Sequence, residues 1–231
     1  MGLRNQTKCC LIIFDFDGVL ADSKEAYAMQ MQETVEHFSG KQLSEEVFKE
    51  RVGNTDQKQD FIEFLENDDP ELLDSAIQYY VDITDKYSFL RSLYSGVSET
   101  LEELKKTNYI GLVSRKSQER MEKWLQHFKI THLFDKPIGT LEKTKSKAIV
   151  QIMNEFGIPN NRTLMIGDTE FDIQSAQQAR VKSVFAHYGA ATPEKVLELN
   201  PDYTINNITE LIALIDSLKK TMNSSATDLN R

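Results

Sequence analysis

The sequence predicts an α/β protein with three layers, a central parallel sheet between helices, and an inserted all-helical segment. The continuous apolar run at 9–14 is typical of a strand that is covered on both faces. From residue 96 onward, short apolar strands alternate with amphipathic helices, which indicates a parallel sheet with helices on both sides. Between these two parts, residues 22–93 show helical patterns and no convincing strand.

The helical insert follows directly after the first predicted strand. Apolar residues recur at helical spacing around Phe61 and again around Tyr80, while Ser39-Gly40 and Asp69-Pro70 provide breaks. An insert of about 70 residues is too long for an ordinary loop, so we expect a small cap domain made of helices. The expected boundaries are 1–20 and 94–220 for the α/β core, 21–93 for the cap, and 221–231 for a disordered tail.

The elements after the insert follow one another in a regular order. The predicted strands are 109–113, a short one near 137–138, 163–168, 182–187 and 202–205. The predicted helices are one around Leu101, then 121–128, 149–156, 171–179, 192–199 and 208–220. The tail beyond residue 220 has no periodic apolar pattern, and we therefore expect it to be disordered.

Composition and charge argue against several classes of partner. The formal net charge of −9 disfavours an electrostatic grip on nucleic acid or on an anionic membrane. No apolar run approaches the roughly 20 residues that a membrane span needs, and the first residues lack a secretory signal pattern. The only cysteines, Cys9 and Cys10, are adjacent and provide no disulfide framework. We expect a cytoplasmic protein, monomer or homodimer, that binds neither nucleic acid nor membrane.

Charged and polar residues gather where the predicted strands end. Asp15 and Asp17 follow the first strand, 114–116 end the second, and Asp168 and Asp172 follow the fourth. In open α/β sheets, ligands bind beyond the carboxyl ends of the strands. Four carboxylates at one place repel one another, and a hard divalent cation bound by oxygens removes that repulsion. Few histidines and no cysteine cluster disfavour zinc, so we expect Mg²⁺.

These strand ends resemble the signature motifs of the haloacid dehalogenase-like hydrolase superfamily. The stretches that carry the resemblance are DFDGVLADS at 15–23, GLVSRKS at 111–117 and MIGDTEFD at 165–172. The family's remaining signature is a lysine, and several lysines crowd FDKPIGTLEKTKSKAI. Comparison with the phosphoglycolate phosphatase-like branch places this lysine at Lys143, with Lys145 as the second candidate. The resemblance covers most of residues 9–215 and implies a Rossmann-like core with a helical cap.

The resemblance also implies a catalytic role for four residues. It implies that Asp15 attacks phosphorus to form an aspartyl-phosphate, and that Asp17 acts as general acid and general base. Ser114 is expected to donate a hydrogen bond to the phosphoryl group, and Lys143 is expected to neutralise its charge. The family's reaction is therefore expected to depend on two carboxylates with different tasks beside one phosphorus atom.

The metal site that the resemblance implies uses oxygens from three segments. The side chains of Asp15 and Asp168 and the backbone carbonyl of Asp17 are expected to hold Mg²⁺. Asp172 lies one helical turn after Asp168 and is expected to support the metal directly or through water. The expected function is a Mg²⁺-dependent phosphatase, phosphoglycolate phosphatase-like, whose partner is a small phosphate ester covered by the cap.

Two regions are candidates for substrate binding. Arg115 stands next to Ser114, where related enzymes often carry Asn; it is expected either to bind a second anionic group of the substrate or to pair with a surface carboxylate. In the insert, RVGNTDQ at 51–57 resembles the loop that selects the substrate in this family. The candidates in that loop are Arg51, Gly53, Asn54, Thr55 and Asp56.

Other functions remain open at this point. Dehalogenases of the superfamily lack the second carboxylate, so Asp17 argues against that reaction. A phosphomutase usually has Glu where this chain has Gly167, and a phosphonate hydrolase needs a cap lysine, for which Lys49 and Lys58 are candidates. A phosphoprotein phosphatase and a catalytically silent phosphate-binding regulator are further alternatives.

Overall fold

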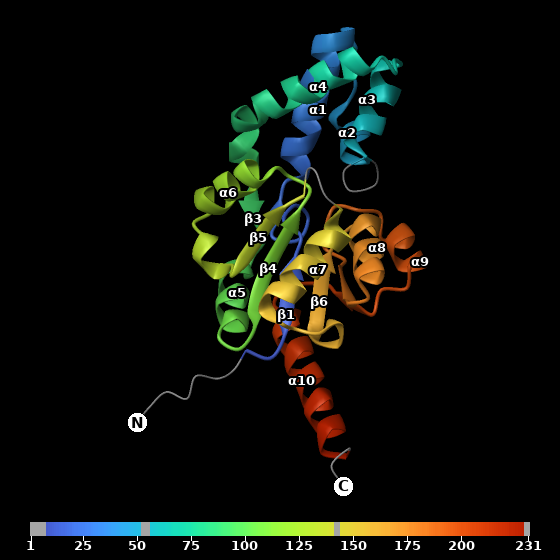
Figure 1. Cartoon of the computed structure of the whole chain (residues 1–231). Coiled ribbons are helices and arrows are strands. Elements are labelled where there is room, and N and C mark those ends of the chain that lie inside the picture. Colours follow the sequence, from blue (N-terminus) through green and yellow to red (C-terminus); the bar gives the residue numbers. More distant parts are fainter. Residues whose placement is uncertain (1–7, 52–55, 141–143, 229–231) are drawn as a thin grey trace.

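The computed structural model describes residues 8–51, 56–140 and 144–228, with side chains as far as residue 221. Within these residues the chain forms a six-stranded parallel sheet in the order β5-β4-β1-β6-β7-β8 (Figure 1). The strands are β1 (Leu11–Phe14), β4 (Tyr109–Ser114), β5 (Lys136–Gly139), β6 (Thr163–Gly167), β7 (Lys182–Ala186) and β8 (Tyr203–Ile205). The predicted fold class, a three-layer Rossmann-like core with a helical insert, is confirmed.

The central strand β1 is apolar at every position because both of its faces are covered. Ile12 and Phe14 belong to the hydrophobic cluster on one side of the sheet, and Leu11 and Ile13 belong to the cluster on the other side. Successive side chains of a strand point to opposite faces, so a strand buried on both sides shows no polar alternation. This is why the run at 9–14 is continuous in the sequence.

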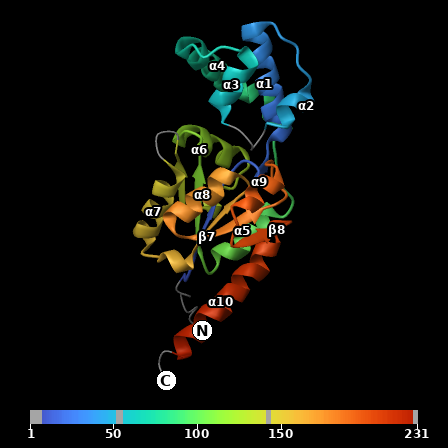
Figure 2. The same cartoon turned by 90° about the vertical axis from the view of Figure 1, so that its right-hand side faces the viewer.

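Helices cover both faces of the sheet (Figure 2). The face of Ile12 and Phe14 packs against α5 (Val97–Lys105), α6 (Gln118–His127) and α10 (Glu210–Asp228). The face of Leu11 and Ile13 packs against α7 (Lys145–Phe156) and α8 (Glu170–Ala179), with α9 (Pro193–Glu198) beside α8 and β7. The periodic apolar positions that predict these helices are the ones that they bury against the sheet.

The insert packs around a hydrophobic cluster of its own, beyond the carboxyl end of β1 (Figure 1). Its elements are α1 (Lys24–Ser39), α2 (Glu45–Lys49), α3 (Gln57–Leu65), α4 (Pro70–Asp82) and the 3-10 helix η1 (Ile83–Leu90). Met31, Phe48, Phe61 and Leu73 are buried in this cluster. The insert therefore contributes a second small core, and polar side chains are left between it and the sheet.

Two very short strands join the insert to the core. β2 (Ala21–Asp22) pairs antiparallel with β3 (Ser92–Leu93), so the chain enters and leaves the insert through adjacent segments. The expectation of no strand within 22–93 is wrong at both of its ends. Strands of two residues are too short to show the alternation by which a strand is recognised in a sequence.

Helix α10 is longer than the sequence pattern predicts. It runs to Asp228, whereas the apolar spacing ends near residue 220. Residues 221–228 contain neither Gly nor Pro, so nothing in their chemistry interrupts the helical hydrogen bonds. The end of α10 projects away from the core (Figure 1). In the described parts of the chain, neither α10 nor another helix has the length and apolar character of a membrane span.

Candidate active site

The predicted site residues meet at the carboxyl edge of the sheet, on the side of the insert. Asp15 follows β1, Ser114 ends β4 and Asp168 follows β6. Because β4, β1 and β6 are neighbours in the sheet, these three residues lie side by side although they are far apart in the chain. The backbone N–H of Asp15 donates to the carbonyl of Ile166 at 2.9 Å, which extends the sheet pairing to the first aspartate.

Asp15, Asp168 and Asp172 form a buried acidic cluster. One carboxylate oxygen of each lies within 4.8 Å of the others. Burial raises the pKa of Asp15 to about 6, with Lys145 opposing this rise and Asp172 adding to it. Burial, followed by the nearby carboxylates of Asp172 and Asp15, raises the pKa of Asp168 well above its usual range. The cluster is thus short of positive charge.

The donor chemistry of this cluster fits a hard divalent cation. Oδ2 of Asp168 accepts from the backbone N–H of Ala190 at 2.8 Å, but its Oδ1 is buried without a hydrogen-bond partner among the described residues. A buried carboxylate oxygen without a partner is costly unless a cation satisfies it. The cluster offers only oxygens, and this set suits Mg²⁺ rather than Zn²⁺.

Two glycines let the backbone approach Asp168 closely. A Cβ built at Gly18 or at Gly189 would overlap the Asp168 side chain. Gly18 also has a φ of +75°, a left-handed conformation that side chains other than glycine adopt at a cost. Gly18 lies within the quoted DFDG stretch, whereas no sequence signal marks Gly189. Both belong to the site, and the sequence analysis did not include them.

Lys145, the first residue of α7, is the cation of the acidic cluster. Its Nζ lies 2.8 Å from Oδ2 of Asp15 and 2.6 Å from Oδ1 of Asp172, and its side chain is buried. Burial lowers the pKa of Lys145, but the two carboxylates outweigh that effect and raise it. Lys143, the residue preferred by the sequence analysis, lies outside the described residues. The second candidate is therefore the lysine that the described structure brings to Asp15.

Asp172 holds two parts of the site together. Its Oδ1 contacts Lys145, and its Oδ2 accepts from the backbone N–H of Thr169 at 3.1 Å and from the Thr169 hydroxyl at 2.7 Å. The Thr169 and Asp172 side chains form a capping box at the start of α8. Both carboxylate oxygens are occupied, so Asp172 supports the site mainly by orienting Lys145.

Asp17 stands in a different electrostatic environment. Its carboxylate pairs with the ammonium of Lys116, lies 3.4 Å from Nη1 of Arg91 and accepts from the Ser23 hydroxyl at 2.9 Å. Partial burial raises the pKa of Asp17, but Lys116 and Arg91 together outweigh it and hold this pKa well below its usual range. Asp15 and Asp17 are separated by a single residue, yet the pKa of Asp15 is raised and the pKa of Asp17 is lowered.

Ser114 and Arg115 point to different surroundings. The Ser114 side chain is buried, and its Oγ lies 3.4 Å from the backbone nitrogen of Lys116. The Arg115 guanidinium is half exposed; it lies 3.6 Å from Oδ2 of Asp56 in the insert and 5.0 Å from the ring centroid of Phe171. Arg115 was expected either to bind a second anion of the substrate or to pair with a surface carboxylate. In the structure it pairs with the surface carboxylate of Asp56.

Of the candidate substrate loop in the insert, only the two flanks are described. Arg51 forms ion pairs within the insert, at 2.5 Å to Glu63 and 3.7 Å to Asp60. Asp56 caps α3 by accepting from the backbone N–H of Lys58 at 3.0 Å. The remaining candidates, Gly53, Asn54 and Thr55, lie outside the described residues.

Three other residues next to the site were missed by the sequence analysis as functional candidates: Ser23, Arg91 and Lys116. Lys116 and Ser23 lie inside the stretches GLVSRKS and DFDGVLADS that carry the family resemblance, and this position could have indicated them. Arg91 is 74 residues from Asp17 in the chain, and nothing in its sequence surroundings indicates that it reaches the site.

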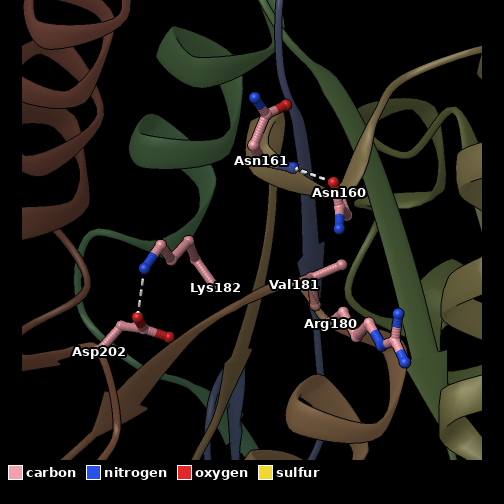
Figure 3. Close-up of a pocket in the computed structure, with 6 residues that line it drawn as sticks. All are labelled: Asn160, Asn161, Arg180, Val181, Lys182 and Asp202. Carbon is pink, nitrogen blue, oxygen red and sulfur yellow. Dashed lines mark hydrogen bonds and ion pairs between the residues drawn. The ribbon is translucent and has the colours of Figure 1, made fainter.

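A separate cavity of about 220 Å³ lies at the other end of the sheet and is not part of this site (Figure 3). It is lined by Asn160, Asn161, Arg180, Val181, Lys182 and Asp202. These residues lie near the amino ends of β6, β7 and β8, where Lys182 donates to Asp202 at 2.5 Å. Ligands of open α/β sheets bind at the opposite edge, where the acidic cluster is found.

Fold and site together define an α/β core that carries a helical insert and a buried cluster of carboxylates that could hold a metal ion. Residues 12–186 match the model of the family described as haloacid dehalogenase-like hydrolase, and the chain belongs to this family. This result confirms the resemblance on which the site residues were predicted.

Two groups of known proteins are similar over nearly the whole chain. "Pyrophosphatase PpaX" of Bacillus pumilus is 25% identical, with 91% of this chain and 98% of the relative covered. A "Phosphoglycolate phosphatase" of Aliivibrio fischeri is 28% identical, with 89% of this chain and 96% of the relative covered.

Among solved structures, a haloacid dehalogenase-like hydrolase of Streptococcus pneumoniae has a TM-score of 0.80 at 21% identity, with 90% of this chain and 98% of that structure's chain covered. A subfamily IA hydrolase of Geobacter sulfurreducens has a TM-score of 0.70 at 24% identity, covering 93% and 100%.

Proposed function

We propose that the protein is a Mg²⁺-dependent phosphatase that hydrolyses a small organic phosphate monoester through an aspartyl-phosphate on Asp15. The observation that carries this proposal is the placement of Asp15 between the Lys145 ammonium and the carboxylates of Asp168 and Asp172. A carboxylate at the end of a central strand, next to a buried cation, is suited to attack a phosphoryl group. Family membership and phosphatase relatives support the same reaction class.

The residues present would hold the metal with oxygens only. Asp15 and Asp168 would provide side-chain ligands, Asp17 its backbone carbonyl, and Asp172 support through Lys145 or a water molecule. When bound, Mg²⁺ would supply positive charge that draws the phosphoryl oxygens toward Asp15 and offsets their charge. The unpartnered Oδ1 of Asp168 supports this assignment.

In the first half of the reaction, an Asp15 oxygen attacks phosphorus and the bond from phosphorus to the leaving oxygen breaks. The leaving oxygen takes the bonding electrons and a proton from Asp17. Lys145 offsets charge on Asp15 and on the phosphoryl group, and the Ser114 hydroxyl donates to a phosphoryl oxygen. The insert at 21–93 would cover the substrate and exclude bulk water.

In the second half, water attacks the phosphorus of the aspartyl-phosphate and releases inorganic phosphate. Asp17 accepts the proton of that water, and the Asp15 carboxylate is restored. The ionised Asp17, favoured by Lys116 and Arg91, is the form that this step requires. The first step requires the protonated form, so these two ion pairs must be weakened when substrate enters.

The names of two relatives point to small substrates with more than one charged group. They refer to pyrophosphate and phosphoglycolate, which carry a second phosphate and a carboxylate respectively. We propose a substrate of comparable size, because the insert places its helices over the carboxyl edge of the sheet.

A phosphate-release assay on a panel of small phosphates tests this function. We expect turnover with Mg²⁺, no turnover with a chelator, and loss of turnover in Asp15→Asn with the thermal unfolding transition retained. The matched control is Asp202→Asn, a surface aspartate paired with Lys182 far from the site. Turnover that persists in Asp15→Asn, or in chelator, would contradict the proposal.

A further inference from the structure

Two nearly buried cations converge on Asp17, and the proposed chemistry at Asp15 does not require either of them. Lys116 and Arg91 both pair with the Asp17 carboxylate, and their side chains are 13% and 5% exposed. One carboxylate cannot neutralise both an ammonium and a guanidinium, so this part of the site carries an excess of positive charge. Burial is the main cause that lowers the pKa of Lys116, and the charges of Arg91 and Arg120 lower it further.

Arg91 is held in place by neighbouring side chains. Its Nη2 donates to Oε1 of Gln30 at 2.6 Å, and its guanidinium lies 5.0 Å from the ring centroid of Trp124. The Gln30 amide donates in turn to the carbonyl of Tyr80 and to the hydroxyl of Thr84, both at 3.0 Å, which fixes its orientation. Nε of Arg91 is buried without a hydrogen-bond partner of ordinary geometry among the described residues. The Tyr80 hydroxyl of the insert also interacts with the Arg91 guanidinium.

These cations lie on the side of the site where the leaving group of a substrate would be. Asp17 is the residue that would protonate the leaving oxygen, so groups that contact Asp17 lie near the atoms attached to that oxygen. The Asp17 side chain is 36% exposed, whereas that of Asp15 is 11% exposed. Asp17 is therefore the more exposed of the two aspartates.

We propose that Lys116 and Arg91 bind a second anionic group that the leaving group of the substrate carries, a carboxylate or a second phosphate. This inference rests on the proposed function and deepens it, because it names the substrate class. The second anion takes over part of the contacts that Asp17 makes with the two cations in the substrate-free protein. Esters of the same size without a second charge leave these cations paired with Asp17 alone.

Arg115, for which the sequence left open either a second anion or a surface carboxylate as partner, is less suited to this task. Its side chain is 51% exposed and pairs with Asp56 of the insert. An exposed cation loses much of its attraction for an anion to solvent and salt, whereas a buried one does not. Lys116, the next residue in the chain, contacts Asp17 directly and is the stronger candidate.

The test compares substrates with and without a second negative charge, on variants at residue 116 and one control variant. The substrates are 2-phosphoglycolate, pyrophosphate and ethyl phosphate, whose ethyl group carries no charge. The variants are Lys116→Met, Lys116→Arg and the surface control Lys182→Met. We expect Lys116→Met to lower kcat/KM for the preferred anionic substrate about ten- to hundredfold more than for ethyl phosphate. Lys116→Arg should keep most of the preference, and Lys182→Met should keep all of it. Preference for 2-phosphoglycolate or for pyrophosphate identifies the second anion as carboxylate or phosphate.

Several results would overturn the inference. An equal loss on all substrates in Lys116→Met assigns Lys116 to positioning Asp17 only. Equal use of charged and uncharged substrates by the unmodified protein overturns the inference while the phosphatase function stands. If no phosphate is released from any substrate, the proposed phosphatase function is wrong. Calorimetric binding of 2-phosphoglycolate and pyrophosphate in the presence of Mg²⁺ then tests the anion site alone. Binding that weakens in Lys116→Met then supports the anion site, and absent or unchanged binding refutes it.

Discussion

The ammonium of Lys145 lies 2.8 Å from a carboxylate oxygen of Asp15 and 2.6 Å from one of Asp172. One buried cation thus joins the end of β1 to the first turn of α8, across the sheet edge where the acidic cluster lies. Without Lys145, the described part of this cluster would hold three buried carboxylates and no direct cationic partner. Its position links the stability of the site with the chemistry proposed for it.

Replacing Lys145 with Met should lower kcat about a hundredfold or more, because a positive charge next to the transferring phosphoryl group is lost. The same change at Lys143 is the matched comparison, and we expect an effect of no more than a few-fold. Steady-state phosphate release with Mg²⁺ measures both. A larger loss in Lys143→Met than in Lys145→Met would assign the catalytic lysine to residue 143 instead.

Removing the Lys145 charge should also destabilise the metal-free protein, by about 3–5 kcal/mol, because buried carboxylates are left without their partner. Added Mg²⁺ should restore much of this loss, since the cation supplies the missing charge. Denaturant unfolding of Lys145→Met with and without Mg²⁺ measures both effects. A loss of stability that Mg²⁺ does not alter would show that Lys145 acts through packing.

Mg²⁺ should stabilise the native protein by mass action, by about 2.7 kcal/mol at a free concentration one hundred times the Kd. Asp168→Asn should abolish this gain, because Asp168 would provide a central ligand, while Asp202→Asn should retain it. The readout is Tm as a function of Mg²⁺ concentration. An unchanged Mg²⁺ response in Asp168→Asn would remove this residue from the metal site.

The raised pKa of Asp15, about 6 against an ordinary value of 3.8, predicts a pH dependence of stability without metal. Between these two values the unfolded chain loses the proton while the folded protein keeps it. Stability contributed by Asp15 should therefore be complete below about pH 4 and decline as the pH rises to about 6. The difference in unfolding free energy between the native protein and Asp15→Asn, followed from pH 4 to 7 in chelator, isolates this contribution. A difference that does not change over this range would contradict the raised pKa.

Gly18→Ala should disrupt the site, and Gly40→Ala is its control. Both glycines have positive φ, +75° and +69°, so both substitutions carry a backbone cost of about 1 kcal/mol. A Cβ at Gly18 would overlap the Asp168 carboxylate, whereas a Cβ at Gly40 meets no atom within 4 Å. We expect Gly18→Ala alone to lose the stabilisation by Mg²⁺, as measured by Tm. Equal behaviour of the two variants would mean that the contact with Asp168 does not matter.

The predicted fold followed closely from local patterns because the pattern and the structure have the same cause. Strand β1 is apolar throughout, and β4 and β6 are apolar over most of their length, since helices cover both of their faces. The helices show apolar residues at the spacing that faces the sheet. The two-residue strands β2 and β3 were missed because they are held by pairing with each other and not by a pattern of burial.

Strand ends and motif spacing are local features, so the sequence was enough to predict that Asp15, Ser114 and Asp168 lie at one edge of the sheet. The contacts of Lys145 with Asp15 and of Arg91 with Asp17 arise from tertiary packing, which local patterns do not encode. Lys145 is the first residue of α7, so its contact with Asp15 depends on where this helix begins. Contacts across 74 residues depend on how the insert folds back over the sheet, and no local pattern encodes that path.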